Sequence, residues 1–124
     1  MMAKPPKDEP GRVVSRTINN AMAMIEEFRK VEPSITANAI LAFMFICIEP
    51  GITGVELQRK MGLNNSTVVR VVASLSSHHR GGKDGHDLIR YKEDYIDRRV
   101  KHLHLTPHGE YLWKRVCKAL EVSV

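Results

Sequence analysis

The chain has 124 residues, of which 43% are hydrophobic and 27% are charged, a balance that excludes a fibrous or wholly disordered protein and suits one globular domain. Its formal net charge of +5 favours polyanionic partners if the charge is localised. Two cysteines, Cys47 and Cys117, are too few for a disulfide-built secreted scaffold, and we interpret them as buried, reduced thiols.

The N-terminal residues 1–14 are predicted to form a disordered tail, because they are rich in proline and carry charges of both signs. They hold no apolar stretch that would suit a signal peptide. The most hydrophobic segment, residues 37–48, spans 12 residues, fewer than the roughly 20 that cross a bilayer. We therefore expect a soluble, cytoplasmic protein that makes no contact with a membrane.

Two helices are predicted after the tail. Over residues 15–31 the apolar side chains recur at helical spacing, and Pro33 ends the helix because the residue before a proline is pushed out of the α region. A second helix is capped near Ser34 or Thr36 and runs to Glu49. It is apolar almost all round, which predicts the central helix of the core.

A pair of short helices follows. Thr53, with Glu56 three residues later, forms a capping box for the first of them, and Gly62 closes that helix in the left-handed conformation. Asn64 caps the second helix, which runs to about residue 77. Two short helices joined by a tight glycine turn are typical of a helix-turn-helix. The side chains expected to face the core are Val55, Leu57, Met61, Val68, Val71, Val72 and Leu75.

A β-hairpin and a last helix complete the chain. After a loop rich in Gly and His at residues 76–87, the segments 88–92 and 100–105 have strand-like composition and are joined by the charged turn EDYIDRR. Thr106-Pro107 is a strong start for a helix that runs to about Val122. The order of elements predicts a mainly α fold with a small β-hairpin wing.

This fold is a winged helix-turn-helix, expected over residues 15–124 with flanking dimerisation helices. Two segments resemble the MarR (multiple antibiotic resistance regulator) family: GLNNSTVVRVVASL, and LIRYKEDYIDRRVKHLHLTPHGEYL. The most specific features are Asp97-Arg98-Arg99 and Leu105-Thr106-Pro107-His108-Gly109. The loop at residues 78–87 is longer than the family pattern, and family members usually continue the last helix beyond the length seen here.

The resemblance implies a homodimeric transcription regulator of double-stranded DNA. In that family the recognition helix enters the major groove and the wing reaches the neighbouring minor groove. A small-molecule effector is a further partner that the resemblance allows. We expect the dimer to be built from the apolar residues Ile18, Met22 and Ile25 of the first helix with Leu112, Val116 and Leu120 of the last.

The residues themselves also favour DNA binding. Residues 53–105 carry ten Lys and Arg against six Asp and Glu, a net +4 of the chain's +5, and phosphate binding requires such localised charge. Asn65 and Arg70 are the expected base readers, and Arg98 and Arg99 fit insertion into a minor groove. Val69 is expected either to contact a thymine methyl or to pack on the wing. The candidate DNA-binding residues are Asn64, Asn65, Ser66, Thr67, Val69, Arg70, Ser74, Lys92, Arg98, Arg99 and Lys101.

Metal binding and catalysis find little support in the sequence. Its six histidines have no carboxylate or cysteine at a recognisable ligand spacing, so we predict no metal and no cofactor. No phosphate-binding glycine loop, H-E-x-x-H motif or nucleophile elbow is present, so we predict that the protein is not an enzyme. The histidines are His78, His79, His86, His102, His104 and His108.

Two alternatives remain open. In the first, the winged helix is a protein-interaction module, although the surface of such a module should be more apolar and less basic. In the second, the protein is a replication or partition accessory factor that binds DNA without sequence preference. Strong salt dependence together with a lack of sequence preference would identify the second.

Overall fold

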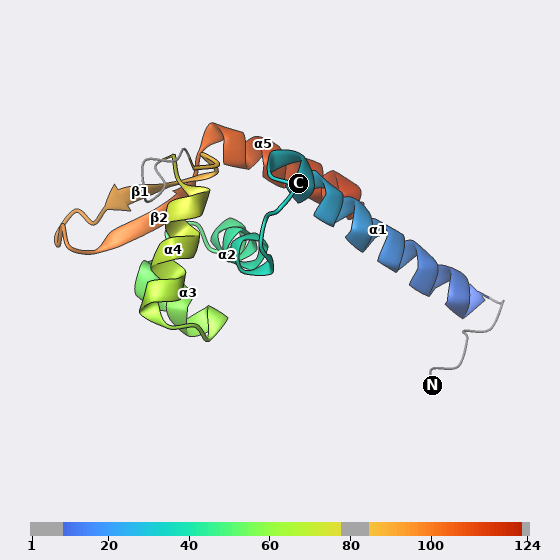
Figure 1. Ribbon diagram of the computed structural model, residues 1–124, viewed down its shortest axis with the longest axis horizontal. Coiled ribbons are helices and arrows are strands. Elements are labelled where there is room, and N and C mark those ends of the chain that lie inside the picture. The colour runs from blue at the N-terminus through green and yellow to red at the C-terminus, as the bar shows by residue number, and fades with distance from the viewer. Residues whose placement is uncertain (1–8, 78–84, 123–124) are drawn as a thin grey trace.

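Five helices and one β-hairpin make up the part of the chain that the computed structural model describes, residues 9–77 and 85–122 (Figure 1). This arrangement confirms the mainly α fold with a small β wing. The expected tail residues 1–8 and the loop residues 78–84 lie outside the described residues. In chain order the elements are α1 (Glu9–Val31), α2 (Ala37–Ile48), α3 (Gly54–Met61), α4 (Asn65–Leu75), β1 (Ile89–Glu93), β2 (Lys101–Leu105) and α5 (Pro107–Ala119).

Helix α1 begins earlier than expected. Residues 9–14, which we assigned to the tail, are helical. Pro10 does not oppose this, because it stands in the first turn, where backbone N–H groups have no partner within the helix. The helix ends at Val31 as predicted, and its first turns extend beyond the rest of the molecule (Figure 1).

Helix α5 packs against α1 within the same chain. Arg115 of α5 forms an ion pair with Glu27 of α1, and Arg16 lies 2.6 Å from Glu121 just beyond the end of α5. The burial of Glu27 raises the pKa of its carboxyl, but the hydrogen bond from Lys30 and the charge of Arg115 outweigh it, so the pKa is lowered overall. These pairs join the last helix to the first.

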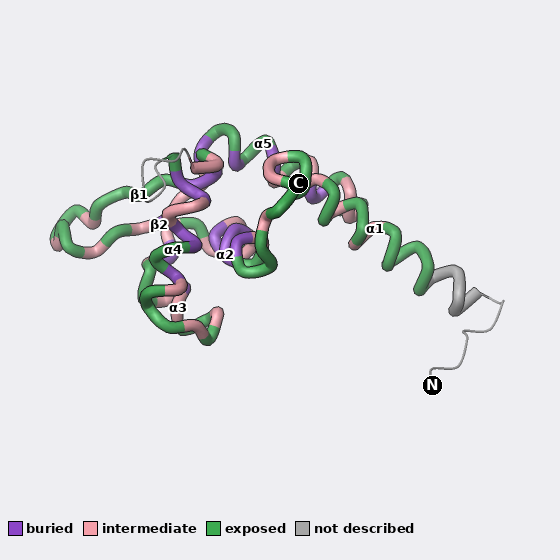
Figure 2. The backbone as a smooth tube through the Cα atoms, viewed as in Figure 1, coloured by how far each residue is buried: buried purple, intermediate pink, exposed green. Residues whose placement is uncertain are grey.

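Helix α2 is the central core helix, as predicted. The rings of Phe43 in α2 and Phe28 in α1 meet edge to face, with their centroids 5.5 Å apart, a favoured geometry for aromatic pairs. Figure 2 shows the buried backbone gathered at α2 and along the sides of its neighbours that face it. The helix is not buried all round, because Leu41 and Ile48 remain exposed.

The helix-turn-helix is formed by α3 and α4. Thr53 caps α3, its hydroxyl oxygen accepting from the backbone N–H of Glu56 at 3.2 Å. Gly62 ends α3 with a φ of +66°, the left-handed conformation that the sequence predicted. Asn64 caps α4 through its side-chain oxygen, which accepts from the backbone N–H of Thr67 at 2.9 Å. The predicted core residues Val68, Val71, Val72 and Leu75 of α4 are all buried.

The wing is an antiparallel hairpin in which Ile89 lies opposite Leu105 and Glu93 lies opposite Lys101. Its strand β2 also pairs along its other edge with residues 51–53. Gly51 donates its N–H to the carbonyl of Leu103 at 2.8 Å, and Leu103 donates to the carbonyl of Ile52 at 2.9 Å. This pairing was not predicted, and it attaches the wing to the segment that leads into α3.

The dimer expectation needs a correction at α5. Leu112 and Val116 are buried in the core of the single chain, so their side chains cannot contact a second copy. They pack inward because α5 lies on α1 and β2 of its own chain. The helix also ends at Ala119, three residues before the expected Val122.

Candidate nucleic-acid interface

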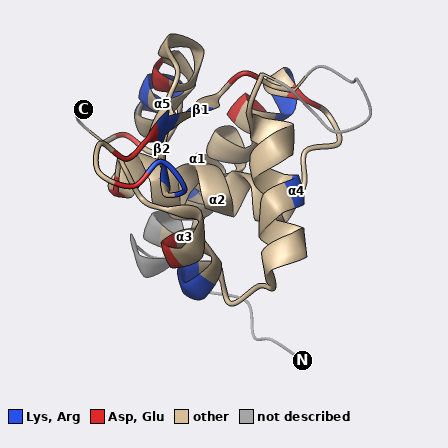
Figure 3. Ribbon diagram, turned by 90° about the vertical axis from the view of Figure 1, so that its left-hand side faces the viewer, with Lys and Arg blue, Asp and Glu red and all other residues tan. Residues whose placement is uncertain are grey.

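A groove of about 420 Å³ lies where α4, the start of α3 and the wing meet. Four of the predicted DNA-binding residues line it, two from α4 and two from the wing. Figure 3, viewed from the side of the hairpin tip, shows α4 to the right and the turn of the hairpin to the left. The residues that line the groove are Thr53, Gly54, Val55, Asn65, Val69, Tyr91, Arg99, Val100 and Lys101.

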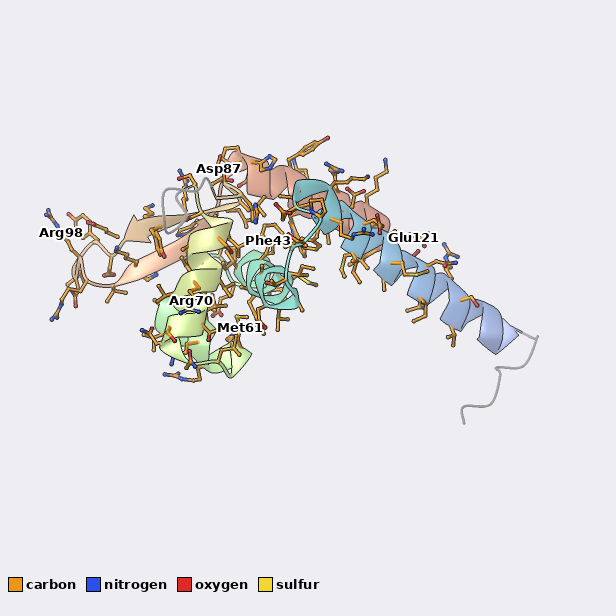
Figure 4. The ribbon with its side chains drawn as sticks, viewed as in Figure 1. Phe43, Met61, Arg70, Asp87, Arg98 and Glu121 are labelled. Atoms are coloured by element: carbon orange, nitrogen blue, oxygen red, sulfur yellow. The ribbon has the colours of Figure 1, made fainter. Side chains whose placement is uncertain are left out.

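Helix α4 presents two different faces to its surroundings. Asn65 and Val69 line the groove beside the wing. Because residues advance by roughly 100° along a helix, Ser66 and Arg70 lie on the outer face, away from the buried valines. Both side chains are exposed, and Figure 4 shows Arg70 on α4 outside the core. The outer face of α4 therefore carries a small polar side chain, Ser66, and a cationic one, Arg70.

Several predicted residues of α4 are already used within the helix. The hydroxyl of Ser66 donates to the side-chain oxygen of Asn64 at 2.9 Å, so this oxygen serves both as the cap and as an anchor for Ser66. Thr67 is half-buried. The hydroxyl of Ser74 donates to the carbonyl of Val71 at 2.7 Å, and Ser74 does not line the groove. Ser74 stands one turn after Arg70 on α4, outside the groove.

Val55 corrects another expectation, because it is exposed on the groove instead of facing the core. The sequence held a signal for this. Val55 and Leu57 are two residues apart, so they lie roughly 200° apart around a helix and cannot both face the core. Leu57 is the buried one. Val55 and Val69 thus give the groove apolar side chains in addition to the charged Arg99 and Lys101.

The wing contributes an aromatic and a cationic side chain to the same groove. Lys101 Nζ stands 5.2 Å from the centroid of the Tyr91 ring, within the range of a cation–π contact. Partial burial raises the pKa of the Tyr91 hydroxyl. Tyr91 was not predicted as a groove residue. Side chains in a strand point to alternate faces, so Tyr91 lies on the same face of β1 as Ile89, and this alternation could have indicated its place. Lys92, the next residue, is exposed on β1.

The turn of the wing is held by two carboxylates. Asp94 accepts from the backbone N–H groups of Ile96 at 3.3 Å and Asp97 at 3.4 Å. Asp97 accepts two hydrogen bonds from the guanidinium of Arg99, each at 3.1 Å. These hydrogen bonds lower the pKa of both carboxyls and raise the pKa of Arg99. Arg98 forms no ion pair with any described residue and extends from the tip of the hairpin (Figure 4).

Two histidines of β2 lie close to Gly51. His102 Nδ1 is 2.7 Å from the carbonyl oxygen of Gly51, and this hydrogen bond raises the pKa of the imidazole. Burial lowers the pKa of His104, and the nearby charges of Lys92 and Arg90 lower it further. Within residues 9–77 and 85–122, no three His, Cys, Asp or Glu side chains gather as a metal site would require. His78 and His79 lie outside the described residues.

None of the helices in the described ranges is both long enough and apolar enough to cross a membrane. No protein-family model matches the sequence, and a search of the curated proteins finds no match. Comparison of the fold with solved structures is more informative.

Many solved structures share this fold. A transcriptional regulator from Thermotoga maritima, Tm0710, is 26% identical with a TM-score of 0.64, over 92% of this chain and 75% of that one. MarR is 21% identical with a TM-score of 0.61, over 92% of this chain and 77% of MarR. MepR of S. aureus, solved in a complex with DNA, is 17% identical with a TM-score of 0.67, over 89% of this chain and 81% of MepR. The resemblance to the MarR family is confirmed in the fold.

Proposed function

We propose that this chain, which has the winged-helix fold of the MarR family, is a sequence-specific regulator that binds double-stranded DNA. The observation that carries the proposal is the shared groove, where Asn65 and Val69 of α4 lie beside Arg99 and Lys101 of the wing. A recognition helix and a basic wing on one face can engage adjacent grooves of a duplex. The neighbour MepR, solved bound to DNA, supports this use of the fold.

The proposed recognition element is the outer face of α4 together with the groove beside it. Ser66 is small and stands in the first turn of the helix, so it allows the backbone to approach the duplex. Arg70 is exposed one turn further on and has the bidentate donors that pair with guanine in the major groove. In the groove, the amide of Asn65 can form hydrogen bonds with adenine, and the methyl groups of Val55 and Val69 can contact the methyl group of thymine.

We further propose that two copies associate through α1. Ile18 and Met22 are each 53% exposed and Ile25 is 42% exposed, and their spacing places them on one stripe of the helix. Such a stripe on a helix that extends from the body suits a two-fold contact with a second copy. Leu120 is half-buried near the end of α5 and stays part of the proposal, whereas Leu112 and Val116 do not.

Selection of bound duplexes from a random pool, at near-physiological salt, tests the function. An enriched inverted repeat with half-sites about one helical turn apart is the expected result for a dimeric regulator. Binding without enrichment would favour an accessory protein that reads no sequence, and no binding at all would favour a protein-interaction module. Lys114→Ala, at an exposed position on α5, serves as a control that keeps α4 and the wing intact.

The dimer has its own test. Met22→Asp introduces a charge into the exposed stripe of α1, so sedimentation velocity should show a monomer where the wild type is a dimer. Binding to a single half-site should persist in the variant, since α4 and the wing are unchanged. A wild-type protein that sediments as a monomer at micromolar concentration would contradict the α1 interface.

A further inference from the structure

The tip of the wing exposes two large apolar side chains. Tyr95 is 101% exposed and Ile96 is 92% exposed, the highest values among the exposed large hydrophobic residues of the described chain. Single exposed apolar residues are ordinary, but these two are adjacent and stand at the end of a hairpin that extends away from the body (Figure 1). Figure 2 shows the exposed backbone at this end of the hairpin. No packing within the described chain accounts for them.

Two acidic residues of the same turn, Asp94 and Asp97, are less exposed than its apolar side chains. The side chains of Asp94 and Asp97 are 29% and 40% exposed, against 90% for Arg99. Their carboxylates are occupied by backbone N–H groups of the turn and by the guanidinium of Arg99. The tip therefore presents apolar side chains and arginine to solvent, while the carboxylates of Asp94 and Asp97 are occupied by hydrogen bonds within the turn.

The turn is also preorganised by its backbone. Asp94 donates its N–H to the carbonyl of Val100 at 2.9 Å, and Val100 donates to the carbonyl of Asp97 at 3.0 Å. With the contacts of the two carboxylates, these bonds fix the chain on both sides of Tyr95 and Ile96. A fixed turn that holds a β-branched side chain outward loses little conformational freedom when the side chain is buried by a partner.

We propose that the wing tip is a minor-groove wedge, in which Ile96, with Tyr95 beside it, enters the groove next to Arg98 and partly unstacks one base step. The inference rests on the proposed function and specifies how the wing of this chain would act. The partner is fixed by charge and shape: arginine favours the negative potential of a narrow minor groove, and apolar side chains inserted there separate stacked bases and bend the duplex.

A sequence preference follows that involves no hydrogen bond to a base. Pyrimidine–purine steps such as TA and CA/TG are the easiest to unstack. The position of the duplex that faces the wing should therefore favour such a step, flanked by A·T pairs that narrow the groove for Arg98. The selected sites from the random pool should show this preference outside the segment read by α4.

The test uses the full chain and a duplex with 2-aminopurine placed in turn at each adenine that faces the wing. Unstacking raises the fluorescence of this base, so wild-type protein should increase it at one step. The double variant Tyr95→Ser/Ile96→Ser should abolish the increase and weaken binding about tenfold, the scale expected for a lost apolar contact. Its salt dependence should stay unchanged, because no cation is removed. Ile48→Ser, at another exposed isoleucine, is the matched control and should leave both readouts unchanged.

Each other outcome overturns the wedge in a distinguishable way. Wild-type protein that binds no duplex would overturn the proposed function together with the wedge. Tight binding with no fluorescence change, and with equal affinity for the double variant, would overturn the wedge alone. Binding to phosphatidylserine vesicles that depends on Tyr95 and Ile96 would assign the tip to a lipid surface, and a shift in sedimentation of the double variant would assign it to a protein contact. Circular dichroism of the double variant should match the wild type, because both side chains are exposed.

Discussion

The imidazole of His102 donates a 2.7 Å hydrogen bond from its Nδ1 to the carbonyl oxygen of Gly51. This contact joins strand β2 of the wing to the segment that leads into α3. The other ring nitrogen, Nε2, lies 3.4 Å from the carboxylate of Asp94 at the base of the wing turn. One side chain thus connects the segment before α3 to the base of the wing turn, so we expect its protonation to affect how firmly the wing is held.

The His102 connection should depend on pH. A neutral imidazole carries one N–H and a protonated one carries two, so only the cation donates to Gly51 and Asp94 together. The Gly51 carbonyl raises the pKa of His102 above its ordinary 6.5, and Asp94 and Glu56 add to this against the effect of burial. The stabilisation is therefore complete below pH 6.5 and is lost as the pH rises through the higher folded pKa. NMR titration of the ring should give a midpoint above 6.5 that falls in Asp94→Asn.

Arg70→Ala tests the reading of the major groove. The exposed guanidinium stands on the outer face of α4, and loss of a bidentate contact to guanine costs about 1–3 kcal/mol at one base position. Competition binding with duplexes changed at each position should show relaxed preference at that position alone. An equal loss of affinity for every sequence would instead identify Arg70 as a phosphate contact.

The two arginines of the wing should differ in effect. Arg99 is held by Asp97 through two 3.1 Å hydrogen bonds, so it must leave this carboxylate before it can enter a groove, whereas Arg98 has no such partner among the described residues. Arg98→Ala should weaken binding to sites with A·T-rich flanks by about 1 kcal/mol or more, and Arg99→Ala by less. If the order is reversed in the same binding titrations, Arg99 is the residue that enters the groove.

The local features of the fold were predictable from the sequence because they depend on neighbouring residues. Thr36, Thr53, Asn64 and Thr106 each cap the helix that follows, since a short polar side chain satisfies the first free N–H groups wherever it stands before a helix. The apolar stripe of α4 was predictable for the same reason, because a spacing of three and four residues fixes one face.

The features that were missed depend on contacts between distant segments. Pairing of residues 51–53 with β2 has no pattern of its own in the sequence. Leu112 and Ile18 look alike as apolar stripe residues, yet only the fold decides that one is buried and the other exposed. The exposure of Ile96 likewise follows from the turn that Asp94 and Asp97 hold, which composition does not reveal.

The thiol of Cys47 should be inert in the native protein. Burial raises its pKa to about 12, with a further contribution from Cys117, and only the thiolate is an effective nucleophile. At pH 8, a thiol reagent such as 5,5′-dithiobis(2-nitrobenzoate) should react with Cys47 only on unfolding, at the rate set by opening of the chain. Comparison with Cys117→Ser separates the two thiols, and rapid reaction of one equivalent in that variant would contradict the prediction.

Gly109 explains why a glycine stands at the start of α5, and its replacement should destabilise the fold. A Cβ atom at this position would lie 2.1 Å from the carbonyl oxygen of Leu88. The backbone cannot easily withdraw, because Thr106 accepts the N–H of Gly109 at 3.0 Å and donates its hydroxyl to the carbonyl of Asp87 at 2.6 Å. These contacts bring α5 directly onto the start of the wing.

Gly109→Ala should therefore lower the free energy of unfolding by about 1–3 kcal/mol, the usual scale of an overpacked site, as measured by urea denaturation. Gly54→Ala is the matched control, since nothing lies within 4 Å of a Cβ atom there and alanine favours a helix by up to about 1 kcal/mol. The control should be neutral or slightly stabilising. Equal stability of Gly109→Ala and wild type would mean that the wing and α5 separate freely, and that the Thr106 contacts do not hold them together.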